Sequence, residues 1–490
     1  MKQRLTYIVF LLMAVGSLQG QSYFNRIHAW GGDLTGLLVL DSGYVTMVRY
    51  QKNFNGLVIR EYGLQGQVVD SAYYLFDDIP FTTANCLFQF SDQKFIGGFS
   101  IGSKVRLIQF NRQWDTLKTN AFQMDTMYTV IHSLYPDSDS TFVASGWFDD
   151  SSDRSHLYLC RLDTALNLLW EKRYYDTTTA VFGGYYGGYV VPVKNKGYLI
   201  GVGGVYPNTR PNKSFIIRTD AAGNELWKKE FSPEEGIGVM RLGQREDGNF
   251  IYVTSESLDT NYRFYNEPMI LRFGVIDSSG TILEDKHIGP ILDNLHTAAF
   301  TQTIDGHFVI GGYTYVDPGK DVSYLFKFTE DGDSIWHRKY WYGYPEGVSI
   351  IYAAKATPDT GLITAGEFFD SEGRYYTFGG PTNYTWLMKL DQYGCDTAGC
   401  HKIGLEENAA TKASLKVYPN PAKNYLVLEW EELQEKVTVK VFTNTGQLIS
   451  EQGFSDVSEI QLNTRSWLSG VYHLQVNDGR QLQSIRIVKE

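Results

Sequence analysis

The sequence predicts an all-β protein, and three observations lead to this prediction. The chain has 490 residues, which is too long for one ordinary domain and suits a large repeat array with an appended domain. It contains 34 tyrosines and 48 glycines but only 14 prolines, a mixture that favours strands and tight turns over helices. One segment also recurs at intervals of 49–57 residues along the chain, which indicates a repeat architecture.

The first 20 residues have the features of a secretory signal peptide. Lys2 and Arg4 precede an apolar stretch from Leu5 to Gly16, and small or polar residues follow up to Gly20. About a dozen apolar residues are too few to span a bilayer, which needs roughly 20. A short buried helix or strand is the alternative. We expect residues 1–20 to be removed, and no later stretch predicts a transmembrane segment in the mature chain.

The charge balance bears on the partners. The chain carries 44 Lys and Arg against 55 Asp and Glu, a net charge of −11. Proteins that bind nucleic acids need a basic surface to displace counterions from the phosphates. A nucleic-acid partner is therefore not expected.

The recurring segment combines an Asp-x-x-Gly turn with a tryptophan four residues after the glycine. Asp220–Trp227 matches Thr329–Trp336. The copy at Asp163–Trp170 lacks the glycine, the copy at Asp277–Glu284 lacks the tryptophan, and a truncated copy begins at Asp391. The positions taken as equivalent to the tryptophan are Val69, Lys118, Trp170, Trp227, Glu284 and Trp336.

Each repeat is predicted to form four short antiparallel strands. An apolar run closed by glycine, such as Phe308–Tyr313, is followed by an alternating run, the Asp-x-x-Gly turn and a strand such as Ile335–Tyr340. One further strand precedes the glycine-closed run. Four strands every 50-odd residues are typical of a β-propeller blade. We predict about seven blades over residues 21–402, with six or eight as alternatives.

These units resemble those of quinoprotein-type eight-bladed propellers and their many non-enzymatic relatives, over roughly residues 24–400. The resemblance implies that each tryptophan docks between neighbouring blades. The enzymatic members use a pair of adjacent cysteines and catalytic acids around a quinone. This chain has no adjacent cysteines, so we expect no quinone cofactor.

A different pattern follows a polar linker at residues 403–413. Alternating strands are predicted at 425–430, 437–443 and 472–476, with a hairpin turn at 444–446. Residues 414–490 are therefore predicted to form a small C-terminal β-sandwich.

This segment contains a set of residues that is spread in a fixed order over its length. They are Tyr418, Pro419, Asn420, Pro421, Gly446, Gly470, Tyr472 and Lys489. With these residues the segment resembles the type A C-terminal sorting domain of the type IX secretion system of Bacteroidetes bacteria. The resemblance implies passage through the type IX secretion machinery, proteolytic removal of the domain, and release or attachment at the cell surface. An accessory sandwich that itself binds a ligand is the alternative.

Cysteines and acidic residues offer few chemical motifs. Cys395 and Cys400 are predicted to form a small disulfide loop in an exported protein, with zinc held with His401 as an alternative that lacks a fourth ligand. Cys86 and Cys160 are expected to be buried thiols.

The run Asp149–Asp153 offers oxygen ligands for calcium, although a solvated acidic turn explains it as well. The histidines form no short metal-binding pattern.

The sequence Gly98-Phe-Ser-Ile-Gly102 spells the nucleophile-elbow motif of serine hydrolases. That elbow needs a helix after the serine. The motif lies where another repeat has Gly311-Gly-Tyr-Thr314, so the repeat itself explains it. No catalytic residue is assigned from it.

Blade geometry predicts where a ligand binds. The Asp-x-x-Gly turns lie on one face, and the longer connections emerge on the opposite face, which we call the loop face. Loops displayed on a rigid scaffold carry function, and aromatic rings beside carboxylates and amides suit sugars or extended peptides. The candidate ligand-binding residues are Trp147, Asp149, Tyr262, Tyr265, Tyr315, Trp341, Tyr344, Phe368 and Tyr376.

Two functions follow from this pattern. The first is a secreted or surface-attached, non-catalytic binding module for a glycan, a peptide or a surface protein. The alternative is a secreted polysaccharide-degrading enzyme, which requires two carboxyl groups about 5–10 Å apart in the central funnel. Asp149, Glu256, Glu267 and Glu367 are the candidates, and nothing in the sequence pairs them.

Overall fold

A computed structural model describes residues 23–490 except 30–31, 33, 51–54, 79, 82–84, 125–127, 153–154, 175–184, 194–196, 205–213, 232–237, 239, 259–267, 318–319, 343–346, 371–382, 399, 401–414, 444–447 and 478–481. The predicted signal peptide at residues 1–20 and the linker at 403–413 lie outside the described residues. The chain divides into two compact units at residue 400, and each is described by itself. Among the described residues, no helix has the length and apolarity needed to cross a bilayer.

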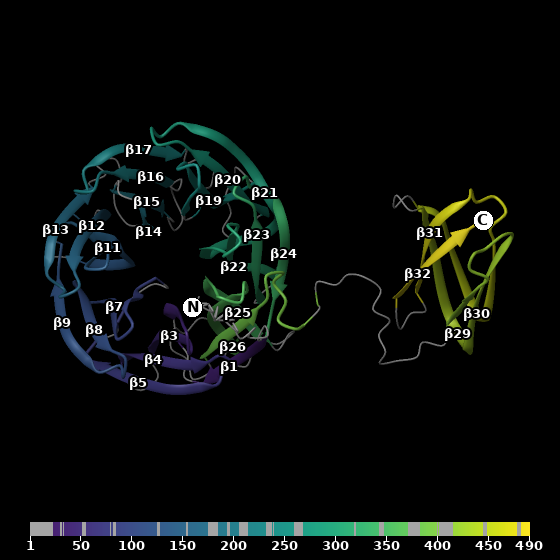
Figure 1. The fold of residues 1–490 in the computed structure, drawn as a ribbon, viewed down its shortest axis with the longest axis horizontal. Coiled ribbons are helices and arrows are strands. Elements are labelled where there is room, and N and C mark those ends of the chain that lie inside the picture. The colour runs from purple at the N-terminus through teal and green to yellow at the C-terminus, as the bar shows by residue number, and fades with distance from the viewer. Residues whose placement is uncertain are drawn as a thin grey trace, which may run out of the picture. The chain divides into compact units, whose positions relative to one another are not determined.

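The first unit is a β-propeller of seven four-stranded blades in the described part of the chain (Figure 1). Within a blade the strands follow one another from the innermost to the outermost. Blade 1 comprises β2 (Leu34–Leu40), β3 (Gly43–Tyr50), β4 (Asn55–Gly63) and β5 (Val68–Phe76). Blade 2 comprises β6 (Leu87–Ser91), β7 (Lys94–Ile101), β8 (Lys104–Asn111) and β9 (Thr116–Phe122). Blade 3 comprises β10 (Thr129–Pro136), β11 (Thr141–Asp149), β12 (Ser155–Asp163) and β13 (Leu168–Tyr174). Blade 4 comprises β14 (Tyr185–Val193), β15 (Gly197–Gly204), β16 (Ser214–Thr219) and β17 (Glu225–Phe231).

Blades 5 and 6 share one strand. The seven-stranded sheet runs through β18 (Arg241–Gln244), β19 (Phe250–Ser257), β20 (Pro268–Ile276), β21 (Ile282–Gln302), β22 (Phe308–Asp317), β23 (Lys320–Phe328) and β24 (Ser334–Tyr340). The first half of β21 pairs with β20 as the outermost strand of blade 5, and its second half pairs with β22 as the innermost strand of blade 6. No loop separates these two blades, because β21 itself is the connection between them.

The ring is closed by strands from distant parts of the sequence. Blade 7 consists of β25 (Gly347–Ala356), β26 (Leu362–Asp370), β27 (Asn383–Leu390) and, outermost, β1 (Phe24–Ala29). The Trp386 indole Nε1 donates a hydrogen bond of 2.7 Å to Asn25 Oδ1 across this junction. The predicted fold class is confirmed, with seven as the number of blades.

The Asp-x-x-Gly motif forms the turn between the third and fourth strands of a blade. Asp220 Oδ1 accepts hydrogen bonds from the amides of Ala222 and Asn224 at 2.9 and 2.8 Å, and Gly223 adopts a φ of +76°. A left-handed residue at this place suits glycine because it has no Cβ. In the copies without the glycine, Trp114 and Leu166 take the same conformation, each with a φ of +63°.

Outer-strand aromatic residues tie neighbouring blades together, as the resemblance implied. The indole Nε1 atoms of Trp227 and Trp336 donate to carbonyl oxygens in the turn of the following blade, Ser278 and Gln392, both at 3.0 Å. Four residues after the tryptophan position, the Tyr174 hydroxyl donates to Gly223 O at 2.8 Å, and Tyr340 donates to Gly394 O at 2.7 Å.

The second unit is a sandwich-like sheet around its own apolar core, which includes Leu426, Val439, Leu474 and Ile487. Its strands are β28 (Lys416–Tyr418), β29 (Tyr425–Thr443), β30 (Leu448–Asn463), β31 (Gly470–Asn477) and β32 (Leu482–Lys489).

The four cysteines divide into two kinds. Cys395 and Cys400 are disulfide-bonded, whereas Cys86 and Cys160 are thiols buried in the propeller. Burial raises the pKa of the Cys160 thiol well above its usual range, so that this sulfur stays protonated and unreactive.

Candidate functional site

Side chains of the innermost strands line a confined, water-accessible space at the centre of the ring. Tyr135 on β10, His296 on β21 and Lys355 on β25 are all exposed to solvent. Burial nevertheless raises the pKa of Tyr135, lowers that of Lys355 and lowers that of His296 to about 4. Side chains that water reaches but that surrounding protein desolvates lie in a narrow channel rather than on an open surface. We call this space the central channel.

One aromatic platform in this region joins two strands of blade 6. The imidazole of His296 stacks on the Tyr313 ring of β22, with ring centres 4.5 Å apart and planes inclined by 13°. Because its pKa is about 4, His296 is neutral at physiological pH. The stack therefore offers a flat, uncharged surface.

A buried carboxyl group lies beside it on blade 7. Glu367 on β26 is 1 % exposed, and neither of its carboxyl oxygens has a hydrogen-bond partner among the described residues. Burial raises its pKa to about 8, and the opposing effect of the Arg49 guanidinium on β3 does not restore the usual value. Glu367 therefore holds its proton at neutral pH and can donate a hydrogen bond.

A second carboxyl group belongs to the same region. Asp321 on β23 is 4 % exposed, and burial raises its pKa to about 6. Burial is the main cause that raises the pKa of the Tyr352 hydroxyl on β25. Electrostatic interactions with the Glu367 and Asp321 carboxyl groups raise this pKa further. Two acids from neighbouring blades thus lie around one tyrosine, one protonated and the other mostly ionised near neutral pH. Arg49, Tyr313, Asp321, Tyr352 and Glu367 are called the acid cluster below.

A cationic platform lies on the other side of blade 6. The Arg241 guanidinium carbon on β18 is 3.7 Å from the Tyr189 ring centre, and its Nη2 donates to Thr297 O at 2.8 Å. The Nε and Nη1 atoms of Arg241 have no hydrogen-bond partner among the described residues. Burial and then this arginine lower the pKa of His132 to about 3, so His132 is neutral.

The predicted ligand-binding residues lie in different environments in the structure. The Trp147 indole donates to His132 Nε2 at 3.0 Å beside the cationic platform. Phe368 is buried between Tyr342 and Tyr384 and has a packing role, whereas Trp341 is 49 % exposed. Tyr315 lies in β22. Tyr262, Tyr265, Tyr344 and Tyr376 lie outside the described residues.

The described carboxylates of the acidic run contact neighbouring side chains. Asp149 Oδ1 accepts a hydrogen bond of 2.6 Å from the Ser155 hydroxyl, and Asp150 Oδ2 lies 3.0 Å from His156 Nε2. Asp153 lies outside the described residues. No group of three or more metal-ligating side chains occurs in the described part of the chain.

The four carboxylates proposed for catalysis are not seen to converge. Glu256 lies in an ion-pair network of blade 5, 2.9 Å from His287 Nε2 and 3.8 Å from Arg272 Nη1. Asp149 is engaged with Ser155, and Glu267 lies outside the described residues. Glu367 is instead accompanied by Asp321, which no sequence pattern singled out.

The serine of the elbow-like motif is structural. Ser100 is the second-last residue of strand β7, and its hydroxyl accepts a hydrogen bond of 3.0 Å from the Ile131 amide of the next blade. A turn at Gly102 with a φ of +56° leads into strand β8 rather than into a helix. The arrangement excludes a nucleophile elbow at this position.

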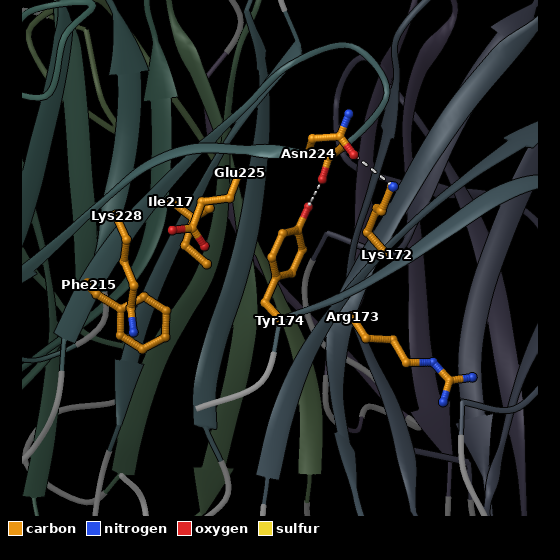
Figure 2. A pocket seen from close by; sticks show the side chains of 9 residues that line it. Lys172, Arg173, Tyr174, Phe215, Ile217, Asn224, Glu225 and Lys228 are labelled. Carbon is orange, nitrogen blue, oxygen red and sulfur yellow. Dashed lines mark hydrogen bonds between the residues drawn. The ribbon is translucent and has the colours of Figure 1, made fainter. Parts of the chain in front are cut away.

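One described cavity lies on the perimeter rather than in the channel. It occupies the groove between the outer strand of blade 3 and the outer strands of blade 4, with a volume of about 340 Å³ (Figure 2). Its lining consists of Lys172, Arg173, Tyr174, Phe215, Ile217, Gly223, Asn224, Glu225 and Lys228. We call it the interblade pocket.

The residues of the sorting motif hold the ends of the second unit together. Asn420 Nδ2 donates to Arg486 O, and Asn420 Oδ1 accepts from the Val488 amide, both at 2.9 Å. The Tyr418 hydroxyl donates to Glu429 at 2.7 Å, and Tyr472 donates to Leu468 O at 2.9 Å. The exposed Pro419 and Pro421 flank Asn420, Gly470 begins β31, Lys489 ends β32, and Gly446 lies outside the described residues.

Comparison with known proteins identifies this second unit. Residues 416–490 match the family of the secretion system C-terminal sorting domain. The fold and this match define the class of protein: an exported β-propeller that carries a sorting domain. The chain is accordingly a cargo of type IX secretion, delivered to the cell surface or the extracellular space. No curated protein matches the sequence.

Several solved structures are similar to the chain at a low level. They include the BP39L lectin from Burkholderia pseudomallei, with 10% identity over 73% of this chain and 99% of the lectin and a TM-score of 0.42. The GH93 alpha-L-arabinofuranosidase of Fusarium graminearum has 11% identity over 62% of this chain and 91% of that chain, with a TM-score of 0.41. The β-propeller domain of the Trilobed protease from Pyrococcus furiosus has 10% identity over 74% and 99%, with a TM-score of 0.40. Such similarity assigns no ligand.

Proposed function

We propose that the propeller is a non-catalytic binding module that captures an extracellular ligand at the loop-face end of its central channel. The observation that carries this proposal is Glu367, a buried carboxyl group with no hydrogen-bond partner among the described residues. Burying such a group without a partner is unfavourable by about 1–3 kcal/mol, and folding alone gives no reason to keep it there. A ligand hydroxyl or carbonyl near Glu367 would satisfy it.

The surroundings of Glu367 suit a polyhydroxylated ligand. The stack of His296 on Tyr313 provides a flat, neutral surface for the C–H face of a sugar ring. Glu367 and Tyr352 supply hydroxyl donors, and Asp321 supplies an acceptor over most of the physiological pH range. Flat apolar area combined with a few directed hydrogen bonds is the usual composition of such sites. A glycan is therefore the ligand class to test first, with an extended peptide or a surface protein next.

A thermal-shift screen of the full mature chain tests this proposal. Neutral and acidic polysaccharides and extended peptides are each added in excess, and a ligand at 100 times its dissociation constant should stabilise the folded state by about 2.7 kcal/mol. The shift should be reduced in His296→Ala, which removes one ring of the flat platform. It should persist in His287→Ala, an exposed histidine on the outer half of the same strand. A shift of the same size in both variants would place the ligand outside the channel.

A second candidate function is hydrolysis of a glycosidic bond. The observation that favours it is the pair of Asp321 and Glu367 around Tyr352, because an acid and a base with separated pKa values are what such catalysis requires. Reducing-sugar release from any polysaccharide found in the screen distinguishes the two functions. A binding module gives no product above the rate of a Glu367→Gln, Asp321→Asn double variant, whereas an enzyme loses its product formation in that variant.

A further inference from the structure

An arginine on an innermost strand carries a charge that no carboxylate balances in the described part of the chain. Arg241 begins β18 of blade 5 and is 4 % exposed. Its Nε and Nη1 atoms have no hydrogen-bond partner, and no acidic side chain pairs with it, among the described residues. Other arginines of the propeller do pair with carboxylates, such as Arg112 with Glu61 at 2.5 Å and Arg272 with Asp285 at 2.6 Å.

A buried charge without a partner is strongly unfavourable. The Glu367 carboxyl group avoids this penalty because it takes up a proton. A guanidinium in a protein stays charged, so Arg241 has no such escape. The folded propeller therefore keeps a permanent cation beside its channel, and the partner that this cation lacks is an anion.

Contacts with both neighbouring blades hold the guanidinium of Arg241 in one orientation. Its carbon atom lies 3.7 Å from the centre of the Tyr189 ring on β14, and its Nη2 donates to Thr297 O on β21 at 2.8 Å. The donors of a guanidinium lie in its plane, so a ring over its face leaves the remaining N–H groups at its edge. Thr297 directly follows His296, whose exposed ring lines the channel, so the guanidinium lies at the channel wall.

The chemistry of this place favours a carboxylate among anions. A guanidinium presents a planar fork of donors that matches the two oxygens of a carboxylate. One guanidinium balances one negative charge. A phosphate dianion would carry a second charge towards Asp321, which is mostly ionised near neutral pH because its pKa is about 6.

We propose that Arg241 binds the carboxylate of a sugar acid whose ring lies on the stack of His296 and Tyr313. This inference rests on the function proposed for the channel and names the ligand class of that site, an acidic rather than a neutral glycan. Blade 6 carries the stack, with Arg241 of blade 5 on one side and Glu367 of blade 7 on the other. The hydroxyl groups of the sugar therefore remain available to the acid cluster.

Two sugars that differ at one carbon atom test this inference on the full mature chain. Galacturonate carries a carboxylate at C6, where galactose carries a hydroxymethyl group. Isothermal titration calorimetry at 0.15 M salt measures both dissociation constants, and a Debye length of about 8 Å then screens repulsion from distant acidic residues. We expect galacturonate to bind at least tenfold more tightly than galactose, as for a hydrogen bond to a charged group.

Variants of Arg241 locate the carboxylate. In Arg241→Met, galacturonate should bind no more tightly than galactose, and the affinity for galactose should stay within twofold of wild type. Arg241→Lys keeps the charge without the planar donors and should lose less of the preference. Arg218→Met is the matched control, because Arg218 is also 4 % exposed but its Nη1 donates to the carbonyl oxygens of Tyr198 and Thr219. This control should keep the wild-type preference for galacturonate.

Melting temperatures without sugar separate a binding role of Arg241 from a structural one. Arg241→Met removes an unpaired buried charge, so it should melt at or above the wild-type temperature. Arg218→Met loses hydrogen bonds to two carbonyl oxygens and should melt below it. A melting temperature of Arg241→Met below that of Arg218→Met would make Arg241 a structural tie between blades and overturn the inference.

Three binding results also overturn it. Equal affinity of the wild type for both sugars would refute an acidic ligand and leave the channel as a site for a neutral glycan. An equal loss in Arg218→Met would report general attraction between charges. If neither sugar binds, the sugar acid is refuted, and the polysaccharide screen then decides the function of the channel alone. His296→Ala tests the channel separately, because it should weaken both sugars alike.

Discussion

The substitution Gly223→Ala tests the idea that neighbouring blades are held by close contact at the turn glycine. Gly223 has a φ of +76°, a conformation that costs an alanine about 1–2 kcal/mol. A Cβ at this position would lie 2.7 Å from Lys172 Cγ and 2.8 Å from Trp170 Cζ3 of the preceding blade. Both distances are too short, so blade 3 has to move, and overpacking of this kind costs about 1–3 kcal/mol. We expect a total loss of about 2–5 kcal/mol.

The matched control is Gly248→Ala. Gly248 has a φ of +89° in the turn between β18 and β19, but a Cβ there would meet no atom within 4 Å. This variant therefore carries the backbone cost alone, about 1–2 kcal/mol. The difference between the two variants isolates the contact between blades.

Differential scanning calorimetry of the full chain measures both. The unfolding entropy is about 2.1 cal/mol/K per residue, so in a unit of this size a loss of 1 kcal/mol of stability lowers the melting temperature by roughly 1–1.5 °C. We expect the propeller transition to fall by roughly 2–7 °C in Gly223→Ala and by roughly 1–3 °C in Gly248→Ala. Equal shifts would refute the reasoning, because the backbone conformation would then account for the whole effect.

Three further predictions concern the acid cluster, the disulfide and export. Glu367 keeps its proton up to a pKa of about 8 in the folded state but loses it near 4.5 when unfolded, so the wild-type propeller should lose stability as the pH rises from 5 to 8. Glu367→Gln should flatten this dependence in calorimetric scans, and parallel curves would contradict it. Replacing both Cys395 and Cys400 by serine should lower stability by about 2 kcal/mol through the lost loop constraint, measured by urea unfolding, and an unchanged midpoint would argue against the constraint. Deleting residues 414–490 should retain the propeller in the periplasm, and its appearance in the culture medium on fractionation would show that export does not need the sorting domain.

The blade repeat could be predicted because its chemistry is local. An aspartate that caps its own turn and a glycine in the left-handed conformation lie within a few residues of each other, as at Asp220 and Gly223. The first repeat shows where such a pattern fails. The pairing skips one residue between Tyr62↔Val68 and Glu61↔Asp70, so Asp70 rather than Val69 occupies the tryptophan position. The other blades have the same irregularity, so it is not what misled the assignment. Gly66, with a φ of +73°, lies four residues before Asp70 as Gly223 does before Trp227, but this copy has neither the aspartate nor the tryptophan that marks the others.

The sequence does not predict that one continuous strand joins blades 5 and 6, because two of its residues favour a break. Gly289 and Pro290 suggest a break between two elements, yet both lie within β21. The left-handed conformation of Gly289, with a φ of +74°, is accommodated inside the strand. Pairing on either side by β20 and β22 holds β21 continuous where the local residues favour a turn.

The acid cluster could be predicted only in part. Glu367 was among the candidate carboxylates, but its raised pKa depends on burial by strands of other blades and on Arg49 of blade 1. Asp321 stands in an ordinary polar stretch of the sequence and acquires its environment only when blades 6 and 7 pack together. No spacing rule links residues whose proximity depends on closing a ring.

The closing strand sets the order in which the molecule can be completed. Asn25 and Trp386 bond to each other although they are 361 positions apart in the chain. A polypeptide delivered from its N-terminus presents β1 first and its partner β27 nearly last. Until then β1 is an unpaired edge, which exposes the chain to association with other copies. A chain interrupted before β27 therefore cannot complete blade 7, and only a nearly full-length product can form the closed ring.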